Sequence, residues 1–316
     1  MRSLKGALEL GRHAVRFIAK NLNPKTFTAR LRRRLQTIIK AKPSSAFDHA
    51  AWRRSARRPG DTARVLVLTP VKTASRYLPR YFELLSRLDY NPRLMSLGML
   101  EGDSDDTSYD DIAARLPELR RHLRKVTLVK HDYGLRIDGV RWAASVQRAR
   151  RETLARARNR LVSAALGDED WVLWLDVDLI DYPPELLRRL MASGKDIVVP
   201  RCDLPNGCDY DLNAFRFDPA KGPAEDPSFL IDGIYQPERG QGRSYLSELP
   251  GDQPAQIHSV GGTALLIRAD LHREGLIFPA YSHRGYIETE GLAMMAKDMG
   301  HDCWALPDLR IVHSPD

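Results

Sequence analysis

Short apolar runs alternate with helical periods along most of the chain. Apolar runs of the length of a buried strand lie at residues 65–68, 94–100, 126–129 and 171–175, and further strands are expected at residues 196–200, 264–268 and 303–306. Apolar residues recur at helical spacing at residues 77–88, 112–123, 141–166 and 292–299. This alternation predicts an α/β fold with a layered sheet. Ligands of such sheets bind outside the carboxyl ends of the strands, where residues 69–70 and 176–178 fall.

The first 60 residues differ from the rest in charge. They hold 16 Lys and Arg residues against 2 acidic ones, whereas the other 256 residues hold 33 basic and 39 acidic residues. We therefore divide the chain into a basic N-terminal arm with linker, residues 1–60, and a globular domain, residues 61–316. Apolar residues recur at near-helical spacing in the arm, so it either lies on an anionic membrane surface or is a solvated tail. The mildly acidic domain offers no broad positive face, so we expect no nucleic-acid partner.

Composition sets the broad class of protein. With 316 residues and 43% hydrophobic residues, the chain can bury a sizeable core, which excludes disorder throughout. Three cysteines (Cys202, Cys208 and Cys303) are too few for a disulfide scaffold, and none forms a Cys-x-x-Cys pair that would indicate structural zinc. No apolar run reaches 18 residues and no signal-peptide core is present. These features predict a cytoplasmic protein. If the arm binds a membrane, the protein is attached peripherally to the cytoplasmic face.

The most informative local motif is Asp176-Val-Asp178, directly after the apolar run 171–175. Side chains two apart on an extended chain face the same way, so the two carboxylates can be presented together. Two hard oxygen donors suit Mg²⁺ or Mn²⁺ and leave positions for phosphate oxygens of a substrate. Two ordinary surface acids are the alternative, but their place at the exit of a core strand favours a metal site. His313, after the apolar pair Ile311-Val312, is a candidate third ligand or an ordinary histidine.

Further polar residues are candidates for binding or catalysis. Glu288 and Glu290 precede a predicted helix, where they can bind an acceptor hydroxyl, act as a base, or simply face the positive end of the helix dipole. Asp211 and Asn213 offer a carboxylate and an amide to sugar hydroxyls, or form a turn. Candidate phosphate ligands within an otherwise solvated basic helix are Arg156, Arg158 and Arg160. No P-loop, dinucleotide-binding or nucleophile-elbow motif occurs.

Several separated blocks, taken in order, resemble the Anp1/Mnn9/Van1 family of mannosyltransferases over roughly residues 64–315. These blocks are Val65-Leu-Val-Leu-Thr-Pro-Val71, Tyr81-Phe-Glu-Leu-Leu85, Ser96-Leu-Gly98 with Asp103-Ser104, Ala155-Arg-Ala-Arg-Asn159, Trp171-Val-Leu-Trp-Leu-Asp-Val-Asp178, Asp196-Ile-Val-Val-Pro200, Tyr210-Asp-Leu-Asn213, Val260-Gly-Gly262, and Glu288-Thr-Glu-Gly-Leu292 with Met295-Ala-Lys297. The resemblance implies a GT-A glycosyltransferase fold, with a Rossmann-like nucleotide-binding sheet joined to an acceptor-binding part. It also implies retaining transfer of a hexose, mannose from GDP-mannose in the first instance, to a glycan or glycolipid acceptor with Mn²⁺ or Mg²⁺.

The resemblance assigns roles to individual residues. Asp176, Asp178 and His313 match the metal site. The nucleotide site is implied at Thr69, Pro70, Asp103, Ser104, Arg151, Arg158 and Asp176. The candidates for catalysis at the transferred sugar are Asp211, Glu288, Glu290 and Arg158. A nucleotidyltransferase and a non-catalytic sugar-nucleotide-binding subunit of a polysaccharide-synthesis complex are the competing interpretations.

Overall fold

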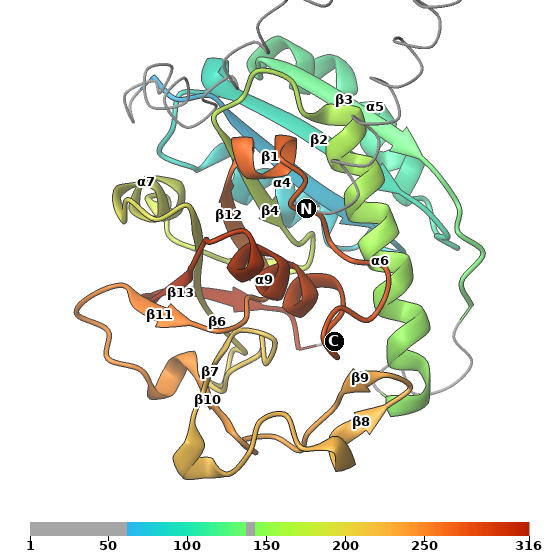
Figure 1. The fold of residues 1–316 in the computed structure, drawn as a ribbon. Helices are drawn as coiled ribbons and strands as arrows, with labels where there is room; N and C mark the ends of the chain where they lie inside the picture. The colour runs from blue at the N-terminus through green and yellow to red at the C-terminus, as the bar shows by residue number, and fades with distance from the viewer. Residues whose placement is uncertain (1–61, 137–142, 316) are drawn as a thin grey trace, which may run out of the picture. The chain divides into compact units, whose positions relative to one another are not determined.

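The computed structural model describes residues 62–136 and 143–315 (Figure 1). Its main sheet is built from nine strands of these residues: β1 (Val65–Val71), β2 (Met95–Glu101), β3 (Lys125–Lys130), β4 (Trp171–Leu175), β5 (Leu179–Asp181), β6 (Ile197–Asp203), β11 (Ala255–Ile257), β12 (Ala264–Arg268) and β13 (Cys303–His313). The strand order is β11-β13-β6-β12-β4-β1-β2-β3, and β5 pairs with β13 outside this path. The predicted α/β class is confirmed.

The direction of the strands decides which ends share an edge. Strands β3, β2, β1 and β4 are mutually parallel, and β12 is antiparallel to both of its neighbours, β4 and β6. Because β12 is antiparallel to both β4 and β6, β6 runs in the same direction as β4. Strand β13 is parallel to β6 and therefore also runs in this direction. The carboxyl ends of β1, β4 and β13 therefore lie at one edge of the sheet.

Helices cover both faces because side chains alternate along each strand. Val65 and Val67 pack on the face covered by α4 (Leu78–Ser86), α5 (Ser108–His122) and α7 (Leu186–Ala192). Leu66 and Leu68 pack on the opposite face, under α6 (Ala144–Ala165), α8 (Ala269–Arg273) and α9 (Glu288–Asp298). Figure 1 shows α6 and α9 in front of the sheet on this side. Two small antiparallel sheets lie outside the main one: β7 (Phe215–Phe217) pairs with β10 (Arg243–Tyr245), and β8 (Leu230–Ile231) pairs with β9 (Ile234–Tyr235).

The elements differ from the sequence prediction mainly in length. Strand β13 continues to His313, beyond the predicted end at residue 306, because a register shift between Leu306 and Arg310 lets it resume pairing with β6. Helix α9 begins at Glu288, so both acids lie in its first turn rather than before it. The sequence pattern does not predict the short elements α7, α8, β5 and β7 to β11. The helical pattern of the arm lies outside the described residues, and the domain boundary at residues 60–61 stays a prediction.

A membrane span is absent from the described part. None of the helices within residues 62–136 and 143–315 is both long and apolar enough to cross a bilayer.

Candidate active site

The Asp176-Val-Asp178 turn leaves the carboxyl end of β4 and is held by backbone bonds to two other segments. The Asp176 N–H donates to the carbonyl of Thr263 at 2.9 Å. The Ser314 N–H donates to the carbonyl of Asp178 at 3.0 Å, and β5 then pairs with β13 so that His313 lies opposite Leu179. The turn is thereby fastened to the end of β13, and residues 135 positions apart in sequence meet at one edge.

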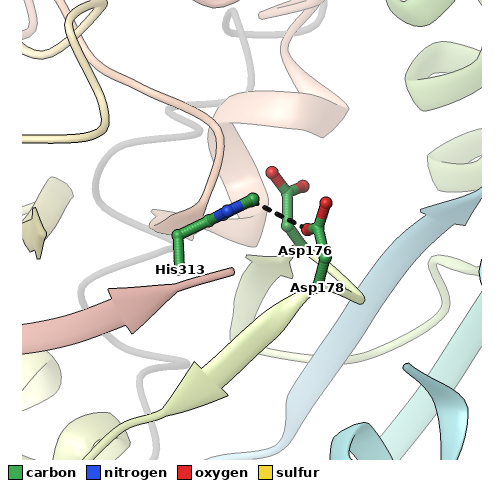
Figure 2. A group of neighbouring side chains, drawn as sticks. All are labelled: Asp176, Asp178 and His313. Atoms are coloured by element: carbon green, nitrogen blue, oxygen red, sulfur yellow. Dashed lines mark ion pairs between the residues drawn. The ribbon is translucent and has the colours of Figure 1, made fainter. Parts of the chain in front are cut away.

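Asp176, Asp178 and His313 form a compact cluster (Figure 2). One ligand atom from each residue can be chosen so that all three lie within 4.8 Å of one another. His313 is buried, and its Nε2 lies 2.9 Å from Asp178 Oδ1. Its Nδ1 lies 2.7 Å from the Ser314 carbonyl, which can only accept, so Nδ1 carries the proton and Nε2 faces the carboxylates. Two carboxylates and an imidazole of this tautomer fit the donor set that Mn²⁺ accepts.

The charges of this cluster influence one another. Burial raises the pKa of Asp176, and the charge of Arg158 only partly opposes that rise. Burial lowers the pKa of His313, but the hydrogen bond and the charge of Asp178 outweigh it and leave the pKa raised. The side chain of Asp176 remains 26% exposed and that of Asp178 20%, so the cluster is open to a ligand.

Arg158 of α6 is the cation next to the cluster. Its guanidinium is 2% exposed and lies 5.3 Å from the ring centroids of both Trp174 and Phe278. Nη2 is 3.4 Å from Asp176 Oδ1, and Nε forms an ion pair of 3.0 Å with Glu288 Oε1. Arg158 therefore links the Asp176-Val-Asp178 turn to the first residue of α9.

Asp211 packs directly against the Gly261-Gly262 turn. Its carboxylate accepts a hydrogen bond of 3.0 Å from Thr263 Oγ1, and burial raises its pKa. A Cβ on Gly261 would lie 1.7 Å from Asp211 Oδ2, and a Cβ on Gly262 would lie 2.4 Å from Arg158 Nη2. Glycine is required at both positions because Asp211 and Arg158 occupy the space that a Cβ atom would need.

Glu288 and Glu290 occupy different environments although both are buried. Glu288 faces Arg158 and has a left-handed backbone with φ of 56°, which is uncommon for a residue with a side chain. Glu290 accepts from Arg151 Nη1 at 2.6 Å through one oxygen and from Arg243 Nη1 at 3.2 Å through the other. Both oxygens of Glu290 are thus bound to buried arginines.

The residues expected at the nucleotide lie at the same edge, but several of their side chains bond within the protein. Thr69 is buried, and its hydroxyl bonds to Tyr81 and to the Leu175 carbonyl, whereas Pro70 is partly exposed. Asp103 accepts from the backbone N–H groups of residues 133 and 134, at 3.1 and 2.8 Å. The Ser104 hydroxyl accepts from the N–H of residue 73 at 2.8 Å.

Sequence reasoning missed several contacts of the site. Arg243 lies on the short strand β10 with no motif, and Thr263 differs from its apolar neighbours only by its hydroxyl. Tyr210 belongs to one of the blocks that resemble the family, but no role is predicted for its side chain. Its ring lies on the ring of His313. Arg156 and Arg160 of the basic helix were candidates for phosphate, and Arg156 is exposed beside Glu152.

Comparison with known proteins identifies the family. The Anp1 family model matches residues 43–282. The chain is 30% identical over 276 residues to the mannan polymerase complex subunit MNN9 of Candida albicans, covering 79% of this chain and 74% of that protein. It is 31% identical over 275 residues to the mannan polymerase II complex anp1 subunit of Schizosaccharomyces pombe, covering 79% and 64%.

A solved structure was also found. The mannosyltransferase PcManGT from Pyrobaculum calidifontis, in complex with GDP-Man and Mn²⁺, is 16% identical, with 84% of this chain and 63% of that chain covered and a TM-score of 0.45. The family match ends at residue 282, before Glu288 and His313, so the place of these two residues comes from the geometry. The extent of the family match and the identity to the Candida protein lead to one conclusion: this chain belongs to the Anp1 family.

Proposed function

We propose that this chain is a metal-dependent mannosyltransferase, which moves mannose from GDP-mannose to a glycan or glycolipid acceptor with retention of configuration. A glycosyltransferase agrees with the family and with relatives named as mannan polymerase subunits. The observation that carries the proposal is the cluster of Asp176, Asp178 and His313 at the carboxyl edge of the sheet.

The charge of the site supports a divalent cation. Five carboxylates surround the edge, from Asp176, Asp178, Asp211, Glu288 and Glu290. Three arginines face them, namely Arg151, Arg158 and Arg243. When all five carboxylates are ionised and His313 is neutral, the forms that metal binding requires of the ligands, the sum is two negative charges, which a dication would balance. The raised pKa of Asp176 and of Asp211 reflects the cost of keeping these carboxylates charged in a partly buried place.

The proposed mechanism assigns each residue one task. Asp176 and Asp178 would hold Mn²⁺ or Mg²⁺ together with His313 Nε2. When bound, the ion supplies positive charge that stabilises the departing diphosphate. Arg158 holds Asp176 and Glu288 in their relative positions and adds its own positive charge beside the diphosphate. The neighbouring edge of β1 and β2, with Pro70 and Ser104, is where we expect the nucleotide to lie.

Two routes to retention remain compatible with these residues. In one, the acceptor hydroxyl attacks from the side that the diphosphate leaves and gives its proton to the departing phosphate oxygen. In the other, the Asp211 carboxylate displaces the diphosphate and forms an ester bond to the sugar carbon; the acceptor oxygen then displaces the carboxylate, and its proton passes to the departed diphosphate. We propose that Glu288, which is paired with Arg158, is the carboxylate nearest to the acceptor. Glu290 and Arg151 then act as residues that position Glu288, and not as a base and a phosphate ligand.

The test uses the purified full chain, Mn²⁺ and a panel of GDP- and UDP-sugars. We expect GDP-mannose with Mn²⁺ to be hydrolysed slowly and transferred to mannose-chain acceptors. Asp178→Asn should abolish Mn²⁺-dependent turnover without unfolding the protein. Asp302→Asn, at an exposed aspartate directly before β13, should behave as wild type. Full activity of Asp178→Asn would reject the metal site. A well-folded protein that binds a sugar nucleotide but turns none over would support the non-catalytic subunit instead.

Two wider proposals follow from the relatives and from the arm. Since the relatives are named as complex subunits, we propose that this chain also works beside a partner subunit. We further propose that the basic arm, residues 1–60, attaches the enzyme to the cytoplasmic face of an anionic membrane, where lipid-linked acceptors are available. Flotation of the protein with vesicles that contain an anionic lipid tests the second proposal. Deletion of residues 1–60 should abolish this flotation.

A further inference from the structure

The aromatic pair Tyr210–His313 is the closest in the described part of the chain. The ring centroids lie 3.6 Å apart and the planes are inclined by 13°, which is a face-to-face stack. Other aromatic pairs among these residues are at least 4.6 Å apart, and most are edge-on or tilted. A stack of this kind restricts rotation of the imidazole out of its plane.

The backbone that carries Tyr210 is itself anchored beside β13. After β6 the chain turns back on itself, and the Tyr210 N–H donates to the Cys202 carbonyl at 2.9 Å. Strand β6 runs parallel to β13, with Cys202 opposite Ile311. Tyr210 is therefore brought to the strand next to the one that ends in His313, and its ring is held over the imidazole by the main sheet.

The stack restricts a rotation of the imidazole that the hydrogen bonds of His313 leave possible. Nδ1 is bonded to the Ser314 carbonyl and Nε2 faces Asp178, so both polar contacts of the imidazole are made at the ring edge and neither covers a ring face. The terminal torsion of a histidine has a broad energy well, so an additional contact on the ring face is needed to keep Nε2 aimed at one point. Tyr210 provides that contact.

We propose that Tyr210 is a positioning residue, which holds the His313 imidazole in the orientation required for binding a divalent cation. This inference rests on the metal site of the proposed function and adds a residue that touches neither the ion nor the substrate. The ring face matters rather than the hydroxyl, so phenylalanine should serve and a non-aromatic residue should not. The next residue, Asp211, points instead to Thr263, so the same turn supports the metal ligand and the sugar-site carboxylate.

The test measures Mn²⁺ affinity of the full chain by calorimetry in the absence of nucleotide, together with the melting temperature of the metal-free protein. Tyr210→Phe should bind Mn²⁺ within about twofold of wild type. Tyr210→Leu, which keeps bulk without the flat ring, should weaken binding by about 10- to 100-fold, the usual effect of removing a group that orients a metal ligand. Tyr281→Leu, at a tyrosine that is 51% exposed, is the matched control and should not change the affinity.

The outcomes separate this inference from the metal site itself. If wild type does not bind Mn²⁺, or if His313→Ala binds it as tightly as wild type, the metal site fails and the inference fails with it. If His313→Ala abolishes binding but Tyr210→Leu binds within about twofold of wild type, the metal site stands and the role of Tyr210 is wrong. Should Tyr210→Leu fold poorly, Tyr210→Met takes its place under the same criteria. Weaker Mn²⁺ binding with an unchanged melting temperature supports the positioning role.

Discussion

Glu290 offers the sharpest test of the difference between a buried structural acid and a catalytic base. We consider Glu290→Gln, which removes the charge while nearly keeping the shape. Glu290 is 2% exposed, and the side chains of its partners Arg151 and Arg243 are 9% and 7% exposed. The substitution therefore leaves two guanidinium groups in a poorly solvated place without their shared counter-charge.

The expected loss of stability follows from these contacts. Removing one partner of a buried ion pair costs about 3–5 kcal/mol. Glutamine keeps one acceptor oxygen and can retain the bond to Arg151, so the lower end, about 3 kcal/mol, applies. Since a folded domain is stable by only about 5–15 kcal/mol, this is a large fraction. For a domain of this size, it corresponds to a fall in melting temperature of about 6–12 °C.

The assay is urea unfolding followed by tryptophan fluorescence, with Glu118→Gln as the matched control. Glu118 is exposed on α5, so its substitution should change the free energy of unfolding by less than about 0.5 kcal/mol. At a temperature where both variants are folded, Glu290→Gln should keep most of its turnover. If Glu290→Gln were as stable as Glu118→Gln but lost a factor of about 100 or more in turnover, Glu290 would be the base and this reasoning would be refuted.

Three further predictions concern the glycine turn, an inner histidine and the metal. Gly261→Ala should displace the Asp211 carboxylate and reduce turnover at least tenfold while Mn²⁺ affinity persists; an alanine variant with wild-type turnover would contradict the role of Asp211. The His272 side chain is half-buried, and desolvation lowers its pKa from 6.5 to about 4, so it remains neutral in the fold while the unfolded chain takes up a proton. The contribution of His272 to the free energy of unfolding is therefore fully present above about pH 6.5 and is lost, by about 3 kcal/mol, as the pH falls towards 4. In urea unfolding, the free energy of unfolding of His272→Gln should fall less steeply with decreasing pH than that of wild type. An equal dependence on pH would show that His272 does not cause the loss. Finally, Mn²⁺ at about 100 times its dissociation constant should raise the melting temperature by about 5–11 °C, an effect that Asp178→Asn should remove.

The sequence by itself determined the strands that carry the site and the acid pair at the end of one of them. Residues 171–175 are apolar throughout, because β4 is covered on both faces by helices, and such a run is visible without any structure. Where a strand of this kind stops at charged residues, those residues must reach the edge of the sheet. Both facts are local, and a local pattern in the sequence is sufficient to find them.

The tertiary structure decided how distant residues reach that acid pair, and of these residues only His313 was implied in advance, by the family resemblance. The approach of His313 to Asp178 depends on the short strand β5 and on a register shift within β13, and neither has a clear local pattern. The stack of Tyr210 on His313 and the two arginines on Glu290 likewise join segments far apart in the chain. Such contacts are determined by how strands pair and how helices pack on them, whereas hydrophobic periodicity records only whether each position is buried.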